Sequence, residues 1–144
     1  MRARLPIALA ASLAIAAAGC GGAATQAPAP AGGASAINAD LKEWQIKLDA
    51  SVGKAGTITF TIKNGGEETH EFVVVKTDMA ADALPVVDDK VTEDAVTKVD
   101  EVENITPGST QTLELKDLAP GHYVALCNLL AHYGKGMHAE FTVK

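Results

Sequence analysis

The chain has 144 residues, with 12 Lys or Arg against 18 Asp or Glu, and a formal net charge of −6. Both arginines, Arg2 and Arg4, lie at the N-terminus, so residues 20–144 carry ten lysines and 18 acids, a balance of 10 − 18 = −8. A small acidic domain without arginine is a poor partner for nucleic acid, whose phosphates need cations. The charge is compatible with a basic protein partner, and it would also keep a small exported protein soluble.

Residues 1–19 are typical of a secretory signal peptide. A cationic head that ends at Arg4 is followed by a mostly apolar stretch from Leu5 to Ala18. This stretch is shorter than the ~20 residues that span a bilayer. It runs into Gly19-Cys20 and resembles the lipobox of bacterial lipoproteins, with Ala17 where Leu is usual. We therefore expect an exported protein, periplasmic or on the extracellular face, held at a membrane by acylation of Cys20; plain secretion is the alternative.

Residues 20–36 contain mainly Gly, Ala and Pro and no charged side chain. Such a segment cannot bury enough apolar surface to offset the entropy of ordering it. We therefore predict a flexible tether there and a single domain over residues 37–144.

The domain shows the patterns of short β-strands. Ile58, Phe60 and Ile62 alternate with threonines, which indicates a half-buried strand, and residues 72–75 are apolar on both faces, as in an interior strand. Further strands are expected at residues 43–48, 111–115, 123–127 and 139–143. Six or more short strands joined by Gly/Pro turns favour an all-β, antiparallel β-sandwich.

Residues 77–103 are unusually acidic, with nine acids against Lys90 and Lys98. The segment is too polar to be core, although it could hold a short strand or a helical turn. Two interpretations remain open for it: a docking face for a basic partner, or a solvated connection.

The chemistry-bearing stretch lies near the C-terminus, where Cys127, His132 and Met137 follow one another at intervals of five residues. Cys127 would end one strand and Met137 would begin the next, so the loop between them can bring His132 to the same point. Met137 shares strand parity with Phe141, so we expect it to point into the core, whereas His138 should be exposed on the other face.

A fourth donor must come from elsewhere in the chain. His122 lies five residues before Cys127, roughly 16 Å away along an extended strand, which makes it a poor ligand candidate. His70, at the head of the apolar run 72–75, is the remaining imidazole. A thiolate, two imidazoles and a weak axial thioether form the donor set of a blue-copper site, which tolerates both Cu(I) and Cu(II). Cys127 could instead be an inert buried thiol, although its sole disulfide partner would be the acylated Cys20.

At these motifs the sequence resembles a type 1 copper cupredoxin. The resemblance rests on Asn64 to Val75 and on Pro120 to Met137, with the C-x4-H-x4-M spacing of auracyanin- and sulfocyanin-like proteins. It implies a Greek-key β-sandwich with copper at one end and the ligands His70, Cys127, His132 and Met137. Two departures stand out: Leu130-Ala131 replaces the Pro-Gly of many relatives, and Glu71 stands where azurin and plastocyanin have Asn.

The function expected from these features is electron transfer at one blue-copper ion, not enzymatic catalysis. We expect a monomer whose His132, on the loop beside Leu129, Leu130 and Tyr133, passes one electron to a redox protein such as a basic cytochrome or an oxidase. The two leucines would form a small apolar docking patch around His132, or they would simply pack within the loop. The alternative is an extracytoplasmic copper-delivery or copper-resistance protein that uses the same ligands. A Cys-His-His zinc enzyme lacks a nearby base, and a multicopper oxidase would need more than the two histidines left over.

Overall fold

The computed structural model describes residues 35–144. The expected signal peptide, residues 1–19, and the expected tether up to residue 34 lie outside the described residues. Within residues 35–144, no helix has both the length and the apolar character needed to cross a membrane.

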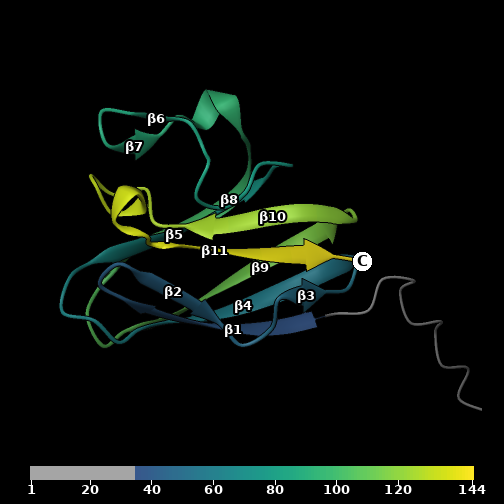
Figure 1. The fold of residues 1–144 in the computed structure, drawn as a ribbon. Helices are drawn as coiled ribbons and strands as arrows, with labels where there is room; N and C mark the ends of the chain where they lie inside the picture. The colour runs from purple at the N-terminus through teal and green to yellow at the C-terminus, as the bar shows by residue number, and fades with distance from the viewer. Residues whose placement is uncertain (1–34) are drawn as a thin grey trace, which may run out of the picture.

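Two β-sheets pack face to face as a sandwich (Figure 1). The first sheet has the strand order β2-β1-β4-β9, with bounds β2 Gln45–Leu48, β1 Ser35–Lys42, β4 Gly56–Asn64 and β9 Thr110–Leu118. The second has the order β3-β11-β10-β5-β8, with bounds β3 Val52–Gly53, β11 His138–Val143, β10 Gly121–Leu126, β5 His70–Lys76 and β8 Thr97–Ile105. A short hairpin of β6 Val86–Val87 and β7 Lys90–Val91, and the 3-10 turns η1 Glu93–Ala95 and η2 Tyr133–Lys135, complete the domain.

The sandwich follows the expected periodicity. Ile58, Phe60 and Ile62 of β4 are buried. β5 is buried on both faces: Phe72 and Val74 pack in the core between the sheets, and Val73 and Val75 pack on a second core cluster with Ala81, Leu84 and Val91. The strands predicted near residues 43–48, 57–62, 72–75, 111–115, 123–127 and 139–143 are all confirmed, as β2, β4, β5, β9, β10 and β11. The all-β sandwich is therefore confirmed.

The sheets are mixed, not purely antiparallel. β1 pairs parallel with β4 and β3 pairs parallel with β11, while the other paired strands run antiparallel. β1 begins at Ser35 and buries Ile37, Ala39 and Leu41 on alternate positions. Its period-2 pattern was available in the sequence, and its parallel pairing becomes possible because the chain makes a second strand, β2, before it reaches β4.

The acidic segment contains a full strand, β8, that the sequence did not clearly indicate. β8 is the edge strand of its sheet, and most of its side chains are exposed. Two register shifts interrupt its pairing with β5, and Asn104 adopts a left-handed φ of 54°. The shifts disturb the alternation of apolar residues, so the pattern of a regular strand is lost. A charged, bulged edge strand is typical of natural sheets, because it discourages pairing with a second chain.

Aromatic residues fill the space between the sheets. Phe60 lies 5.3 Å from Phe72 and 5.4 Å from Phe141, between ring centroids, and Tyr123 stacks on Phe141 at 5.3 Å. Each such pair contributes about 0.5–1.5 kcal/mol beyond the area it buries. These side chains join β4, β5, β10 and β11 into one rigid body that supports the loops at its end.

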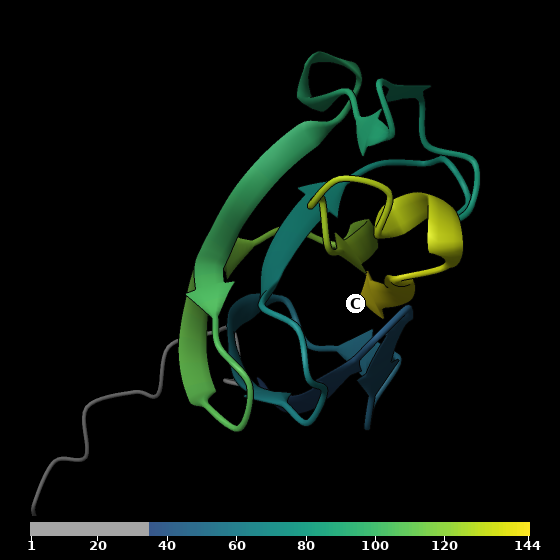
Figure 2. The same cartoon turned by 90° about the vertical axis from the view of Figure 1, so that its left-hand side faces the viewer.

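Four connections gather at one end of the sandwich, at the left in Figure 1 and facing the viewer in Figure 2. They are the β1–β2, β4–β5, β8–β9 and β10–β11 connections. The β6–β7 hairpin packs on the β10–β11 loop, where the N–H of Ala131 donates to the carbonyl of Asp89 at 3.0 Å. The histidines and sulfur residues singled out by the sequence lie at this end.

Candidate metal centre

The structure brings together three residues that are distant in sequence. The donor atoms of His70, Cys127 and His132 all lie within 4.8 Å of one another. Nδ1 of His132 is 3.3 Å from Sγ of Cys127 and 3.4 Å from Nδ1 of His70. Both imidazoles therefore turn the same nitrogen, Nδ1, toward the thiol, and the three atoms enclose a common point.

The positions of these residues follow from the strand ends. His70 is the first residue of β5, and Cys127 directly follows β10, which pairs with β5. His132 reaches the same point because the loop after Cys127 folds back into the turn η2. Cys127 and His70 are fully buried, and His132 is 8% exposed.

Met137 lies beside this cluster, at the start of the return strand. It is fully buried and belongs to the same apolar core as Cys127. Its carbonyl accepts from the N–H of Cys127 at 3.0 Å, and its N–H donates to the carbonyl of His132 at 3.1 Å. Gly136 precedes it with a φ of 104°, a conformation that side chains rarely adopt, and this turn lets Met137 enter the core.

The thiol of Cys127 is buried and receives hydrogen bonds. The N–H of Glu71 donates to Sγ at 3.5 Å, and the N–H of Leu129 is a second backbone donor. Burial raises the pKa of the Cys127 thiol, and these two donors oppose the shift. In the metal-free protein the sulfur is therefore a protonated thiol at neutral pH, and a cation must displace its proton to bind there.

The two imidazoles are neutral at neutral pH for a similar reason. Burial lowers the pKa of His70, and a carboxylate of Glu43 opposes the shift. Burial lowers the pKa of His132 too, and the neighbouring His70 lowers it further. Neutral imidazole is the form that binds a metal ion. Nε2 of His132 lies 3.6 Å from a carboxylate oxygen of Glu68, on the solvent side of the ring.

The loop that carries His132 is braced by residues that the sequence did not single out. The side chain of Asn128 pairs with the backbone of Val91 in β7, accepting from its N–H at 2.7 Å and donating to its carbonyl at 3.1 Å. Ala131 takes a left-handed φ of 67°, and relatives have Gly at this point in the resemblance described above. Burial raises the pKa of the Glu71 carboxyl, and the backbone N–H of Asn128 opposes the shift, so this side chain, at the position where azurin has Asn, faces the loop.

The loop before His70 is held by a buried amide. Asn64 Nδ2 donates to the carbonyls of Glu68 and Ile105, each at 2.8 Å, and Oδ1 accepts from the N–H of Gly66 at 2.9 Å. In the sequence this residue was part of an Asn-Gly-Gly turn signal, and a buried, fully paired side chain could not be inferred from it. It fixes the approach of the chain to His70.

Three other expectations can be compared with the structure. His122 lies away from the cluster and contacts Glu140 at 3.3 Å and the carbonyl of Thr77 at 2.9 Å, in agreement with its exclusion as a ligand. His138 was expected to be exposed, but it is partly buried and its ring lies 5.1 Å from that of Tyr133. Tyr133 lies next to His132 in the loop, as expected, and its side chain is buried.

The Tyr133 ring turns inward because η2 rotates its side chain away from that of His132. It is 5% exposed, and its hydroxyl donates to the carbonyl of Ala81 at 2.8 Å and accepts from the N–H of Leu84 at 2.9 Å. It therefore ties η2 to the segment before the β6–β7 hairpin.

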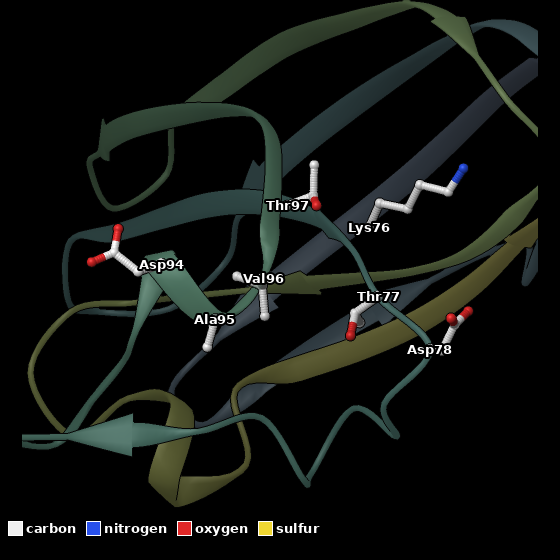
Figure 3. A pocket seen from close by; sticks show the side chains of 7 residues that line it. All are labelled: Lys76, Thr77, Asp78, Asp94, Ala95, Val96 and Thr97. Carbon is white, nitrogen blue, oxygen red and sulfur yellow. The ribbon is translucent and has the colours of Figure 1, made fainter.

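One pocket of the described residues lies away from the histidine cluster. It is lined by Lys76, Thr77, Asp78, Asp94, Ala95, Val96 and Thr97 (Figure 3). Lys76 ends the strand that His70 begins, so the pocket lies about 20 Å from the histidine cluster along β5. It is open and polar and holds neither His nor Cys, and it has no part in the metal centre.

A buried thiol and two buried imidazoles, with a thioether nearby, define the class of site. Soft sulfur donors select copper, and imidazoles accept either of its oxidation states. The residues present therefore fit copper, and the arrangement is that of a type 1 copper site in a β-sandwich.

Comparisons with known proteins agree with this assignment. The family model of the cupredoxin-like domain matches residues 8–143, so the chain belongs to the cupredoxin-like family. A crystal structure of dithionite-reduced auracyanin from Roseiflexus castenholzii has a TM-score of 0.57 and 29% identity, over 78% of this chain and 99% of that one. Auracyanin A from Chloroflexus aurantiacus, described as a "blue" copper protein, has a TM-score of 0.53 and 20% identity, over 78% of this chain and 100% of that one.

Reduced rusticyanin shares the fold, with a TM-score of 0.51 and 18% identity over 77% of this chain and 79% of that one. No curated protein sequence matches the chain.

Proposed function

We propose that the protein is a mononuclear blue-copper carrier that transfers one electron at a time between redox proteins outside the cytoplasm. The proposal rests on one observation, the convergence of His70 Nδ1, Cys127 Sγ and His132 Nδ1 within 4.8 Å. Met137 would be the weak axial ligand, as expected from the sequence. Copper bound there would supply the Cu(I)/Cu(II) couple, and the protein would supply a site that changes little between the two states.

Rigidity of the donors supports electron transfer. The hydrogen bonds of Asn128, Asn64 and Glu71 described above hold the loops on both sides of the cluster. Donors held in this way need little reorganisation when the charge at the centre changes.

His132 is the proposed route for the electron. It is the most exposed of the three converging residues, at 8%, and its outer nitrogen, Nε2, lies on the solvent side near Glu68. Leu130, at 65% exposure, is the most exposed large apolar side chain near it. The edge-to-face contact between Trp44 and His132, with ring centroids 5.1 Å apart, brings a second aromatic ring to this surface. We therefore add Trp44 to Leu129 and Leu130 in the proposed docking patch around His132.

The full burial of His70 and Cys127 favours this function over copper delivery. A protein that hands its metal to a partner must let an incoming ligand reach the ion, whereas here the core closes over both residues. We further propose that the domain is exported, tethered through residues 20–36 to an acylated Cys20, and that its acidic surface meets a basic partner such as a cytochrome. The acyl chain would keep the domain at a membrane where such partners work.

The test is to load the full chain with Cu(II) and record its visible spectrum and its reduction by a one-electron donor. We expect an intense blue thiolate-to-copper band that disappears on one-electron reduction. Cys127→Ser should abolish the band, whereas His122→Gln, which changes an imidazole outside the cluster, should leave it unchanged. A Cys127→Ser protein with the original spectrum would refute the assignment of the thiolate.

Electron transfer and copper delivery can be separated by two rates. A carrier of electrons should show rapid electron self-exchange and slow loss of Cu(I) to a chelator. Slow self-exchange with rapid loss of copper would favour the delivery function.

A further inference from the structure

The β1–β2 turn, which consists of Glu43 and Trp44, faces both histidines of the metal centre. Oε1 of Glu43 lies 3.7 Å from Nε2 of His70, and the Trp44 ring meets the His132 ring edge-on. Trp44 has a left-handed φ of 62°, and this turn places the two neighbouring side chains over different imidazoles. No motif in the sequence singled out this turn.

The carboxylate of Glu43 is held in place by the loop that leads to His70. Oε1 accepts from the N–H of Glu67 at 2.6 Å and from the N–H of Glu68 at 2.9 Å. The cradle is tight, because a Cβ on Gly66 would meet the same carboxylate. The side chain is 30% exposed, yet its position is fixed by groups 24 and 25 residues away in sequence.

Nε2 of His70 has no other partner within reach. Among the residues that the structure describes, it is one of two buried side-chain nitrogen or oxygen atoms without a hydrogen-bond partner. Its ring turns Nδ1 toward His132 and the thiol, so Nε2 points away from the cluster. The Glu43 carboxylate is slightly beyond hydrogen-bond distance, and a small movement of the ring would close the gap.

A histidine that binds a metal through one ring nitrogen usually donates the other N–H to a carboxylate, a carbonyl or water. That second contact decides which nitrogen carries the proton, and thus which one is free for the metal. We propose that Glu43 is the positioning residue of His70: its carboxylate accepts the Nε2–H, which leaves Nδ1 free to face the thiolate. The role of the metal in this inference rests on the copper function proposed above.

The contact has a consequence for the reduction potential. A negative charge beside a ligating imidazole stabilises Cu(II) more than Cu(I), because Cu(II) has the greater positive charge. Removal of the charge should therefore raise the reduction potential. Loss of such a partner typically lowers metal affinity by about 10-fold or more. If the loss falls on Cu(II) and leaves the Cu(I) affinity unchanged, tenfold corresponds to about 59 mV for a one-electron couple.

Glu43→Gln is the decisive variant, because an amide oxygen can still accept from the two backbone N–H groups while the charge is lost. The matched control is Glu114→Gln, which removes one charge from an exposed side chain of β9 that pairs with Lys116. Glu43→Ala, which removes both functions, is a second variant.

Two measurements are made on each protein. The first is the tautomer of His70 in the metal-free, reduced protein, read from nitrogen-15 NMR of the imidazole. The second is the reduction potential of the copper-loaded protein. Thermal unfolding of the metal-free protein reports whether the loop anchor is intact.

We expect the wild type and Glu114→Gln to hold His70 mainly in the Nε2–H form. In Glu43→Gln the amide oxygen still faces Nε2 but carries no full charge, so this preference should weaken and the potential should rise, with a melting temperature close to that of the control. Glu43→Ala, which leaves no acceptor, should lose the preference. The proposal is wrong if Glu43→Gln keeps both the tautomer and the potential of the wild type and only Glu43→Ala is destabilised. In that case Glu43 serves only to anchor the loop before His70.

The outcomes separate this inference from the copper function. If the wild type binds no copper as a blue centre while the tautomer depends on Glu43, the contact stands and the proposed function fails. If the wild type is blue but replacement of Glu43 changes neither the His70 tautomer nor the reduction potential, the copper function stands and the role proposed for Glu43 fails.

Discussion

Met137 is the residue whose chemistry most directly sets the behaviour of the proposed centre. Its thioether is a soft donor, and its loss should leave the thiolate and both imidazoles in place. We expect Met137→Leu to stay blue and to raise the reduction potential by roughly 60 mV, a tenfold change in the one-electron equilibrium. Cyclic voltammetry of the copper protein measures the shift.

The control for this change is Met79→Leu, since Met79 is a partly buried methionine that packs on the second core cluster, away from the metal centre. Its potential should equal that of the wild type. An equal shift in both variants would mean that the thioether of Met137 has no special role.

Three histidines should make the metal-free protein sensitive to mild acid. Burial lowers the pKa of His70, His132 and His138 below the usual 6.5. Below about pH 6.5 the unfolded chain binds protons that the folded chain does not, so the free energy of unfolding must fall as the pH falls. Urea titrations of the metal-free protein at pH 7, 6 and 5 should show a progressive loss.

His138 can be tested alone because it is not a proposed ligand. The His138 ring can account for a difference of at most one bound proton between the unfolded and folded states. His138→Gln should therefore reduce the slope of the free energy of unfolding against pH by at most about 1.36 kcal/mol per pH unit. His122→Gln, which also replaces one imidazole outside the proposed ligand set, is the comparison. An unchanged slope in His138→Gln would mean that this ring titrates alike in both states.

For single residues, the sequence predicted the metal-ligand candidates well, but it did not predict the side chains that contact them. Cys127, His132 and Met137 could be found because their spacing and chemistry are unusual within one short segment. Glu43 acts through backbone N–H groups more than 20 residues away, and such contacts leave no local pattern. The inward direction of Tyr133 was not predicted, because it depends on the turn η2, which strand parity does not describe.

The strands that have a clear local pattern were predicted, and the features that depend on tertiary pairing were not. β4 and β5 were predictable because their side chains alternate or are apolar throughout. β8 was not, since it is a charged edge with two register shifts, and its backbone pairing with β5 compensates for its poor apolar pattern. The parallel pairing of β1 with β4 depends on the order of the chain in space, which periodicity does not encode.

The Asn128 side chain attaches the β6–β7 hairpin to the β10–β11 loop, and this attachment can be tested. Asn128→Ala removes both hydrogen bonds to Val91 and leaves a buried N–H and a buried carbonyl unpaired. We expect a loss of about 1–3 kcal/mol in the free energy of unfolding. Chemical denaturation of the metal-free protein measures it.

Leu130→Ala provides the comparison within the same loop, because Leu130 is 65% exposed and should change stability by less than about 0.5 kcal/mol. Equal stability of Asn128→Ala and the wild type would show that water replaces the side chain without cost, and that the hairpin is not held by this contact.

At the scale of the whole molecule, three acidic residues, Asp88, Asp89 and Glu68, lie at the same end as the proposed metal centre. The Asp88-Asp89 turn rests on the loop of His132 through the hydrogen bond from Ala131, and Glu68 reaches the His132 ring. A basic partner that approaches His132 would therefore meet an attractive field. The structure thus shows where some of the acidic residues lie relative to His132, which the composition alone cannot show.

Electron transfer to a basic c-type cytochrome should consequently slow as ionic strength rises, because salt screens charges beyond about 10 Å at 0.1 M. Stopped-flow rates at several salt concentrations test this. Asp89→Asn should lower the rate at low salt roughly twofold, the effect of about 0.5 kcal/mol for one charge at ~8 Å in water. It should also flatten the salt dependence.

Asp117→Asn is a matched control, since Asp117 has a similar left-handed φ, 54° against 60° for Asp89, and lies near the opposite end of the sandwich. The two variants have the same net charge, so a difference between their rates reports where the partner docks and not how acidic the protein is. A partner that docks at His132 lies closer to Asp89 than to Asp117, so its attraction should depend more on Asp89. Equal rates for the two variants would therefore place the docking site away from His132.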